Sequence, residues 1–140
     1  MKKAFLILTL FFTISLCSQN ITWQNVNLNV PFENTQAVFN LIDGFYSNIE
    51  IPEGIRVSLW SIEYKGSGEK ATHVLNFAGT KENLVEFESR KLTSEWDAYL
   101  TKLNSLTNRD GFSVTAGVTL VRYNIDKWQE SIAQSHQWKV

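Results

Sequence analysis

The stretch "ITWQNVNLNV", residues 21 to 30, alternates between polar and apolar side chains over its whole length. Such a period of two is typical of a strand with one buried face. The apolar side carries Val26, Leu28 and Val30, whereas the polar side carries Asn25, Asn27 and Asn29. Asparagine is depleted in strands, so a face with three asparagines needs an explanation.

The residues that follow change period in a definite order. Residues 31 to 48 have apolar side chains at helical spacing, after a cap signal at Asn34 or Thr35. Residues 55 to 64 and residues 71 to 79 alternate again, and "KGSGEK" between them is typical of a hairpin loop. The first half of the domain is therefore predicted as strand, helix and a strand hairpin.

Residues 80 to 106 carry a second helical stripe, which Thr93 or Ser94 divides by capping a further helix. Residues 112 to 123, "FSVTAGVTLVRY", alternate as a last long strand. The order β-α-β-β-α-β predicts an α+β, ferredoxin-like domain. Its four-stranded antiparallel sheet is expected in the order 4-1-3-2, with the helices on one face and a C-terminal tail extension.

Alternation assigns the strand residues to two faces of this sheet. The face toward the helices is expected to hold Val26, Leu28, Val30, Val57, Leu59, Leu75, Phe77, Val114, Ala116, Val118 and Leu120. The opposite face, called the open face below, then carries Asn25, Asn27, Asn29, Ser58, Trp60, Ile62, Thr72, Val74, Asn76, Thr115, Gly117, Thr119 and Val121, with Trp23 at its rim. Asn27 is expected to contact Asn76 or Val74 on the third strand and residues 115 to 119 on the fourth.

Residues 1 to 18 read as a secretory signal peptide, which predicts a secreted or periplasmic protein. Lys2 and Lys3 form its charged region, and a short apolar run follows. A retained anchor and lipid modification of Cys17 are the alternatives, but the run is short for a membrane span. We therefore expect no stable membrane span after processing, a domain over residues 19 to 123 and a tail over residues 124 to 140.

Charge and cysteine content exclude some classes of function. Removal of Lys2 and Lys3 from 13 basic and 14 acidic residues leaves a net charge of −3, which argues against a nucleic-acid partner. Cys17 is the only cysteine, so the processed domain has no disulfide and no thiol chemistry. About 120 residues suffice for one domain held by core packing.

The open face is too polar for a core and too neutral for an ordinary charged surface. Three interpretations remain open: a solvated face, a seam between two copies of the chain, and a groove for a small-molecule ligand. The groove would use Trp60 as an aromatic platform and the asparagine amides as paired donors and acceptors. The predicted ligand-binding residues are Asn25, Asn27, Asn29, Trp60 and Asn76.

Over residues 21 to 123, element order and this mixed face resemble the dimeric α/β-barrel group of ferredoxin-like proteins. That group includes antibiotic-biosynthesis-type monooxygenases and haem-degrading enzymes. The resemblance implies a homodimer and a ligand between the sheet and the helices of one subunit. For the haem-degrading members it also implies an asparagine on the first strand, matched by Asn25 or Asn27, and a helical tryptophan, matched by Trp96. Their helical histidine has no match, because no helix of the core carries one.

Other chemistry has little support in the sequence. His73 and His136 are far apart and lack a cysteine or an i, i+4 partner, so we expect no metal site and no cofactor. His73 is expected to be a core or rim histidine. In the tail, Trp128 and Trp138 are expected to pack on the domain or on a partner subunit.

The functional prediction is an exported, noncatalytic binding or assembly module that uses the open face for a ligand or a dimer contact. The alternative is a cofactor-independent oxygenase or haem-handling enzyme of the dimeric α/β-barrel type. The sequence leaves the identity of the ligand, the presence of catalysis and the role of the tail undetermined.

Overall fold

The computed structural model describes residues 21–90 and 93–120. Its strands are β1 (Thr22–Asn29), β2 (Arg56–Ser61), β3 (His73–Gly79) and β4 (Asn108–Val118). Its helices are α2 (Thr35–Asn48), α3 (Lys81–Ser89) and α4 (Ser94–Leu106), with a short 3-10 helix at Phe32–Asn34. The predicted signal peptide and tail, including Trp128 and Trp138, lie outside the described residues.

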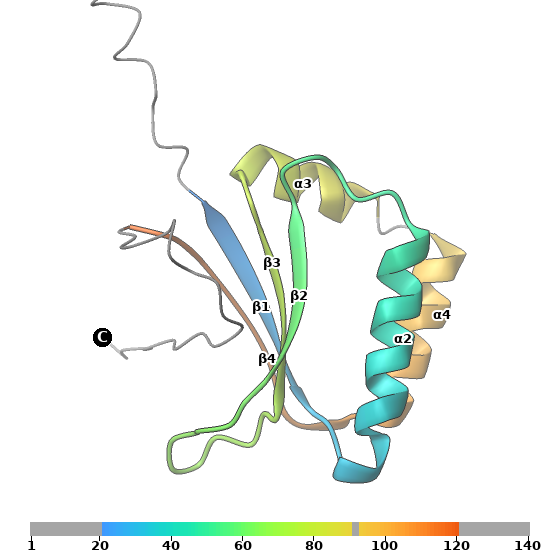
Figure 1. Ribbon diagram of the computed structural model, residues 1–140, viewed down its shortest axis with the longest axis vertical. Coiled ribbons are helices and arrows are strands. Elements are labelled where there is room, and N and C mark those ends of the chain that lie inside the picture. Colours follow the sequence, from blue (N-terminus) through green and yellow to red (C-terminus); the bar gives the residue numbers. More distant parts are fainter. Residues whose placement is uncertain (1–20, 91–92, 121–140) are drawn as a thin grey trace, which may run out of the picture.

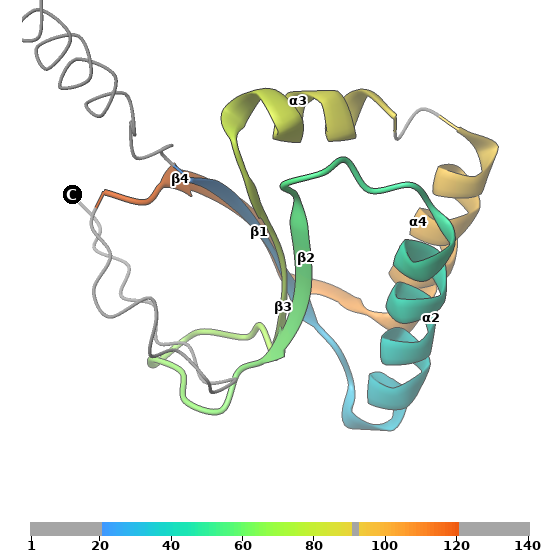
Figure 2. The same cartoon turned by 45° about the horizontal axis from the view of Figure 1, so that its top comes forward.

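The strands form one antiparallel sheet in the order β2-β3-β1-β4, which confirms the predicted ferredoxin-like topology. The helices lie on one side of this sheet, and α2 and α4 lie side by side (Figures 1 and 2). The sheet and the helices therefore form two layers, with the open face of the sheet on the far side. No helix in the described part of the chain is long and apolar enough to span a membrane.

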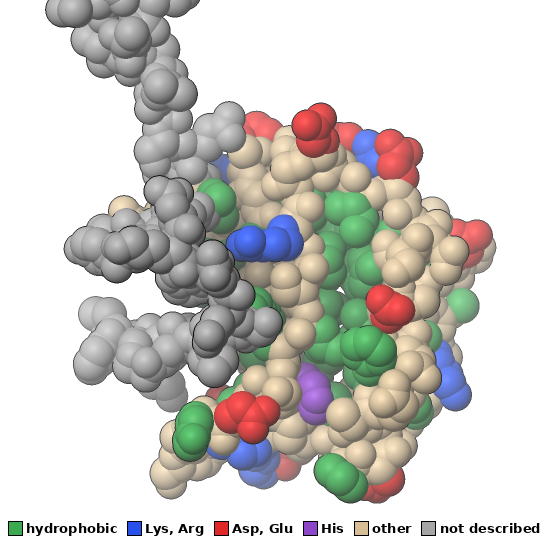
Figure 3. Space-filling view, in the orientation of Figure 1, with side chains coloured by type: hydrophobic (Ala, Val, Ile, Leu, Met, Phe, Trp, Pro, Cys, Tyr) green, Lys and Arg blue, Asp and Glu red, His purple; other side chains and the backbone are tan. Residues whose placement is uncertain are grey.

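The core lies between the two layers. Phe77 on β3 and Phe87 on α3 are each only 1% exposed, as are Leu28 on β1 and Val38 on α2. Aromatic rings continue this core between the helices, since the ring of Phe45 stacks on that of Tyr99 at a centroid distance of 4.2 Å. Figure 3 shows hydrophobic side chains gathered between the sheet and the helix layer, with charged groups around them.

Short polar side chains fix where the helices begin and end. The hydroxyl of Thr80 accepts a hydrogen bond from the backbone N–H of Asn83 and caps α3. The hydroxyl of Thr93 caps α4 in the same way by accepting from Trp96, as predicted. Asn34 precedes α2 but donates its amide to the carbonyl of Leu106 at the end of α4, which ties the two helices together.

The last strand differs from its prediction. β4 begins at Asn108 instead of residue 112, and it ends at Val118. Its residues on the helix side follow the predicted alternation, but Val114 is 52% exposed and Val118 is 46% exposed. Within the described residues, β4 is an edge strand that pairs with β1 alone, so its other edge has no neighbouring strand. The predicted burial of these valines was therefore wrong.

The pairing of β1 with β4 is interrupted by a bulge. Asn27 pairs with Ser113, whereas Asn29 pairs with Asn108. One residue of β1, Leu28, therefore faces the segment 109–112 of β4. This segment is called the β4 bulge below. Gly111 within it has a φ of +93°, a conformation that favours glycine, and a Cβ there would lie 2.9 Å from the Cβ of Lys70.

Candidate functional site

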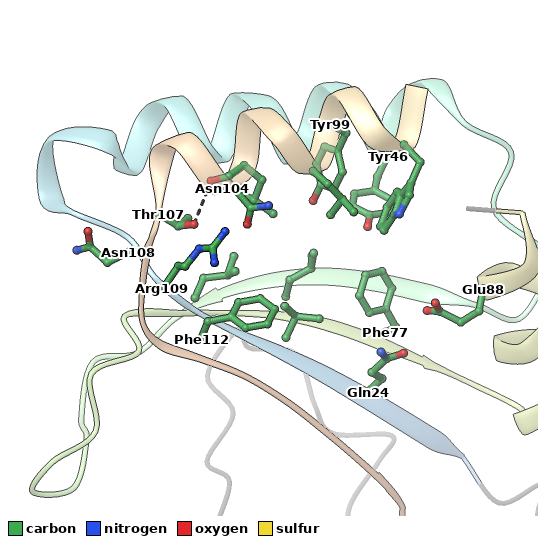
Figure 4. Close-up of a pocket in the computed structure, with 16 residues that line it drawn as sticks. Gln24, Tyr46, Phe77, Glu88, Tyr99, Asn104, Thr107, Asn108, Arg109 and Phe112 are labelled. Atoms are coloured by element: carbon green, nitrogen blue, oxygen red, sulfur yellow. Dashed lines mark hydrogen bonds between the residues drawn. The ribbon is translucent and has the colours of Figure 1, made fainter. Parts of the chain in front are cut away.

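A cavity of about 580 Å³ lies between the helix side of the sheet and helix α4. Its size falls within the range of small-molecule sites. Its walls are mostly apolar and come from β1, β3 and α4, with Val26, Leu75, Phe77, Trp96, Leu100 and Leu103 among them. Figure 4 shows the labelled polar side chains distributed along this space between the strands and the helices.

Two tyrosine hydroxyls lie in this cavity region. Tyr46 comes from α2 and Tyr99 from α4, and Figure 4 shows them close together. Both hydroxyl oxygens are shielded from solvent, and neither makes a hydrogen bond of normal geometry within the described residues. A buried polar group without a partner is unusual in proteins and calls for a physical reason.

Burial keeps both tyrosines protonated. It raises the pKa of Tyr99 to about 12, an effect that the neighbouring Tyr46 hydroxyl partly opposes. Burial also raises the pKa of Tyr46, and the nearby Tyr99 and the negative charge of Glu88 add to this effect. At neutral pH the pair therefore presents two O–H donors rather than phenolates.

The β4 bulge forms part of the cavity mouth. Arg109 and Phe112 both line the cavity, although they are three residues apart and would face opposite sides of a regular strand. The bulge removes this conflict, because it adds residues to β4 without adding any to β1. Figure 4 shows the guanidinium of Arg109 directed toward Asn104, below helix α4.

All five predicted ligand-binding residues lie on the open face, on the other side of the sheet from the cavity. The side-chain amide of Asn76 donates to the side-chain oxygen of Asn25 at 2.7 Å. The side-chain amide of Asn27 donates to the hydroxyl of Ser113 at 2.8 Å. These bonds tie Asn25 to Asn76 and Asn27 to Ser113 across neighbouring strands. Their role toward a ligand stays a prediction.

The neighbours of Asn27 were predicted in part. Val74 on β3 is directly opposite Asn27, as expected. On β4 its partner is Ser113 rather than a residue between 115 and 119. That prediction was wrong because the strand begins earlier than its hydrophobic pattern suggests.

The other two predicted residues are placed differently. Asn29 donates its amide to the backbone carbonyl of Asp110 at 2.7 Å, so it holds the β4 bulge. Trp60 lies on β2, opposite Val74, and is half-buried. Neither side chain lines the cavity.

The described residues hold no group of three or more histidine, cysteine, aspartate or glutamate side chains arranged to bind a metal ion. His73 is half-buried on the helix side of β3, and its Nδ1 lies 2.9 Å from the hydroxyl of Thr72. Burial lowers the pKa of His73, and the charge of Glu63 opposes this shift. His73 is a rim histidine, as predicted, and does not line the cavity.

Sequence reasoning missed the residues that give the cavity its chemistry. Tyr46 and Tyr99 are buried residues of α2 and α4, and neither was among the predicted site residues. Arg109 lies in "TNRDG", which the sequence suggests is a loop. The sequence contains one signal that could have indicated these tyrosines: the hydroxyl of a tyrosine on the buried side of a helix needs a hydrogen-bond partner.

No family model and no curated protein matches this sequence. Among solved structures, a conserved protein from Methanosarcina mazei matches 71% of this chain and 93% of its own, at 10% identity and a TM-score of 0.54. A conserved protein of unknown function and possible oxidoreductase from Bacteroides thetaiotaomicron matches 73% of this chain and 100% of its own, at 10% identity and a TM-score of 0.51.

A cofactor-independent oxygenase from Streptomyces nogalater, SnoaB, matches 77% of this chain and 98% of its own, at 14% identity and a TM-score of 0.46. At sequence identities this low, a structural match shows a similar fold and nothing more. The sheet order and the two matches with TM-scores above 0.5 show that the chain has a ferredoxin-like α+β fold.

Proposed function

We propose that this chain is a small-molecule-binding domain whose ligand occupies the cavity between the sheet and helix α4. The observation that carries the proposal is the pair of buried hydroxyls of Tyr46 and Tyr99, which lie close enough to perturb each other's pKa but make no hydrogen bond of normal geometry within the described residues. A buried donor without an acceptor costs roughly 1–3 kcal/mol of stability. A carbonyl or ether oxygen on a bound ligand would offset that cost.

The surroundings of the hydroxyls define the rest of the ligand. Val26, Leu75 and Phe77 form an apolar floor on the sheet, and Trp96 and Leu100 come from the helix above. Such walls favour a flat or branched hydrocarbon body. The proposed ligand is therefore a largely apolar molecule, aromatic or alicyclic, with at least one hydrogen-bond acceptor.

Titration with prodan, a neutral naphthalene ketone whose emission shifts in an apolar site, tests this proposal. We expect one saturable site per chain. Val26→Phe should abolish it, because Val26 lines the cavity. Val74→Phe is the matched control, since Val74 lies on the open face of the neighbouring strand and should leave binding unchanged. Circular dichroism checks that both variants fold.

Two results would refute the binding proposal. One is the absence of saturable prodan binding to the folded wild-type protein. The other is equal binding by the wild type and a folded Val26→Phe variant. Either result would mean that the cavity does not admit a ligand of this class.

A cofactor-independent oxygenase is the second candidate. The two protonated hydroxyls favour it, because donors in an apolar cavity can stabilise oxygen atoms that become negative during a reaction. Oxygen uptake with 1,4-dihydroxynaphthalene, corrected for its spontaneous oxidation, separates the two candidates. Uptake that falls in Tyr99→Phe supports the oxygenase, whereas binding without added uptake supports the binding domain.

The cavity does not fit haem. Within residues 21–90 and 93–120, no histidine, cysteine or methionine, the usual protein ligands of haem iron, lines the cavity. Its tyrosines are held protonated by burial, which disfavours a phenolate ligand. The haem-handling part of the alternative therefore gains no support from these residues.

Export and dimerisation complete the proposal. The charged and apolar pattern of residues 1 to 18 supports export by a signal peptide. The open face, which carries Trp60 and the Asn25–Asn76 pair and has Arg56 near one end, supports a homodimer in which two such faces meet. Light scattering of the processed protein tests the dimer, and Trp60→Lys should shift it toward the monomer. A monomeric wild type at high micromolar concentration would refute it.

A further inference from the structure

We propose that the cavity selects an anionic ligand, an apolar carboxylate whose charged group binds Arg109 at the mouth. The proposal rests on the proposed binding function and names the ligand class. Among the described residues that line the cavity, Arg109 and Glu88 are the two that carry a charge. Figure 4 shows them at opposite ends of the space, with the tyrosines between them.

Arg109 is available for a ligand. The ion pairs of the described residues are Lys70 with Asp110, and Arg90 with Glu50 and Glu86. Arg109 therefore forms no ion pair within the described part of the chain. Its neighbour at the mouth, Asn104, adds an amide that makes no hydrogen bond to a described residue. Guanidinium and amide groups are well suited to bind a carboxylate together.

The backbone around Arg109 is held in place. Asn29 binds the carbonyl of Asp110 through its amide, and Lys70 pairs with the carboxylate of Asp110. Gly111 packs against the backbone of Lys70 and Ala71, too closely for a Cβ. These contacts fix the bulge that turns Arg109 toward the cavity. Asn29, on the open face, thus acts as a positioning residue for a site on the other side of the sheet.

The charges of Arg109 and Glu88 determine at which end of the cavity a ligand carboxylate binds. A ligand carboxylate near Glu88 would meet a negative charge, whereas the same group at the mouth meets a cation. The apolar body would then lie along Phe112 and Val26 and extend toward Tyr99 and Tyr46. The cavity is thus complementary to an acid with its carboxylate at one end and a second oxygen further along.

Competition against bound prodan tests the selection, with 2-naphthoate and 2-naphthamide as probes of the same shape and different charge. We expect wild-type protein to prefer the anion by about tenfold at low salt, since charged hydrogen bonds are the stronger ones. Arg109→Gln should remove this preference and keep the affinity for naphthamide and prodan. Asn29→Ala should reduce the preference in part, because Arg109 remains but its backbone is less constrained.

Arg56→Gln is the matched control, since Arg56 is exposed on β2 and projects from the open face. It removes the same charge and should leave the preference unchanged. Equal affinities of the two probes for wild-type protein, or a preference that survives in Arg109→Gln, would overturn the inference. In either case, prodan binding that is present in the wild type and lost in Val26→Phe would still support the proposed binding function. A failure of the charge selection is therefore distinguishable from a failure of the binding function.

Discussion

The amide of Asn76 donates a 2.7 Å hydrogen bond to the side-chain oxygen of Asn25, directly across the boundary between β3 and β1. On the other side of β1, Asn27 donates to Ser113 and Asn29 donates to the backbone of Asp110. The three asparagines of the first strand therefore make a row of cross-strand ties. This arrangement explains why a strand tolerates them on one face.

Asn25→Val should destabilise the protein by about 1 kcal/mol, because it leaves the part-buried amide of Asn76 without this acceptor. Asn25→Val combined with Asn76→Val should recover most of the loss, since two opposed valines form a favourable cross-strand pair. Urea unfolding of the single and double variants measures the coupling.

Asn27→Val is the control for this cycle. The bond from Asn27 to Ser113 is exposed, so its loss should change the free energy of unfolding by less than about 0.5 kcal/mol. If the losses from Asn25→Val and Asn76→Val simply add, the Asn25–Asn76 bond does not stabilise the sheet.

The sequence was sufficient for the topology because strand and helix periods are set by local backbone geometry. Strict alternation around Val26 and Leu28 could arise only from a strand with one buried face, and both residues do face the helices. Thr93 identified the start of α4 because its hydroxyl satisfies a helix N–H. Strand alternation and helix capping depend on residues that are close together in the sequence. A single sequence is therefore enough to predict them.

The cavity was not predictable in the same way. It depends on how far helix α4 stands from the sheet and on a bulge in β4, and neither leaves a periodic signal. The pattern places Tyr99 in the core but does not show that its hydroxyl lacks a partner. Likewise, "TNRDG" reads as a loop, although Arg109 and Asp110 belong to the strand.

Gly117→Ala should destabilise the protein by about 1–3 kcal/mol, because an added Cβ would lie 2.6 Å from the indole of Trp23 on the neighbouring strand. The emission of Trp23 should shift as its ring moves. Gly66→Ala is the matched control, since no atom lies within 4 Å of the added methyl group. Equal unfolding midpoints for the two variants would contradict the close packing of Trp23 on Gly117.

The stability of the protein should fall as the pH rises above about 10. The pKa of Tyr99 is raised from 10.0 to about 12 in the folded state, so the unfolded chain loses this proton first. Between these two values deprotonation therefore favours unfolding, by up to about 2 kcal/mol at the upper end. Tyr99→Phe should flatten this part of the pH profile, measured by urea unfolding at fixed salt. An identical slope in the wild type and the variant would show that the Tyr99 hydroxyl is not buried in solution.

Removal of a buried hydroxyl from the cavity should separate stability from binding. Tyr99→Phe eliminates a buried hydroxyl that makes no hydrogen bond of normal geometry within the described residues and keeps the ring that stacks on Phe45, so the unliganded protein should be equally stable or more stable. The same change removes a donor to the ligand, and we expect prodan affinity to fall by about threefold to tenfold.

The fully exposed Tyr64 supplies the control, since Tyr64→Phe should alter neither quantity. Thermal melts with and without prodan measure both effects in one experiment. The wild type should gain more stability from prodan than Tyr99→Phe does, because at one ligand concentration the stabilisation of the folded state increases with the logarithm of the affinity. Equal gains in both proteins, together with a large loss of stability in unliganded Tyr99→Phe, would mean that the hydroxyl serves the fold and not the ligand.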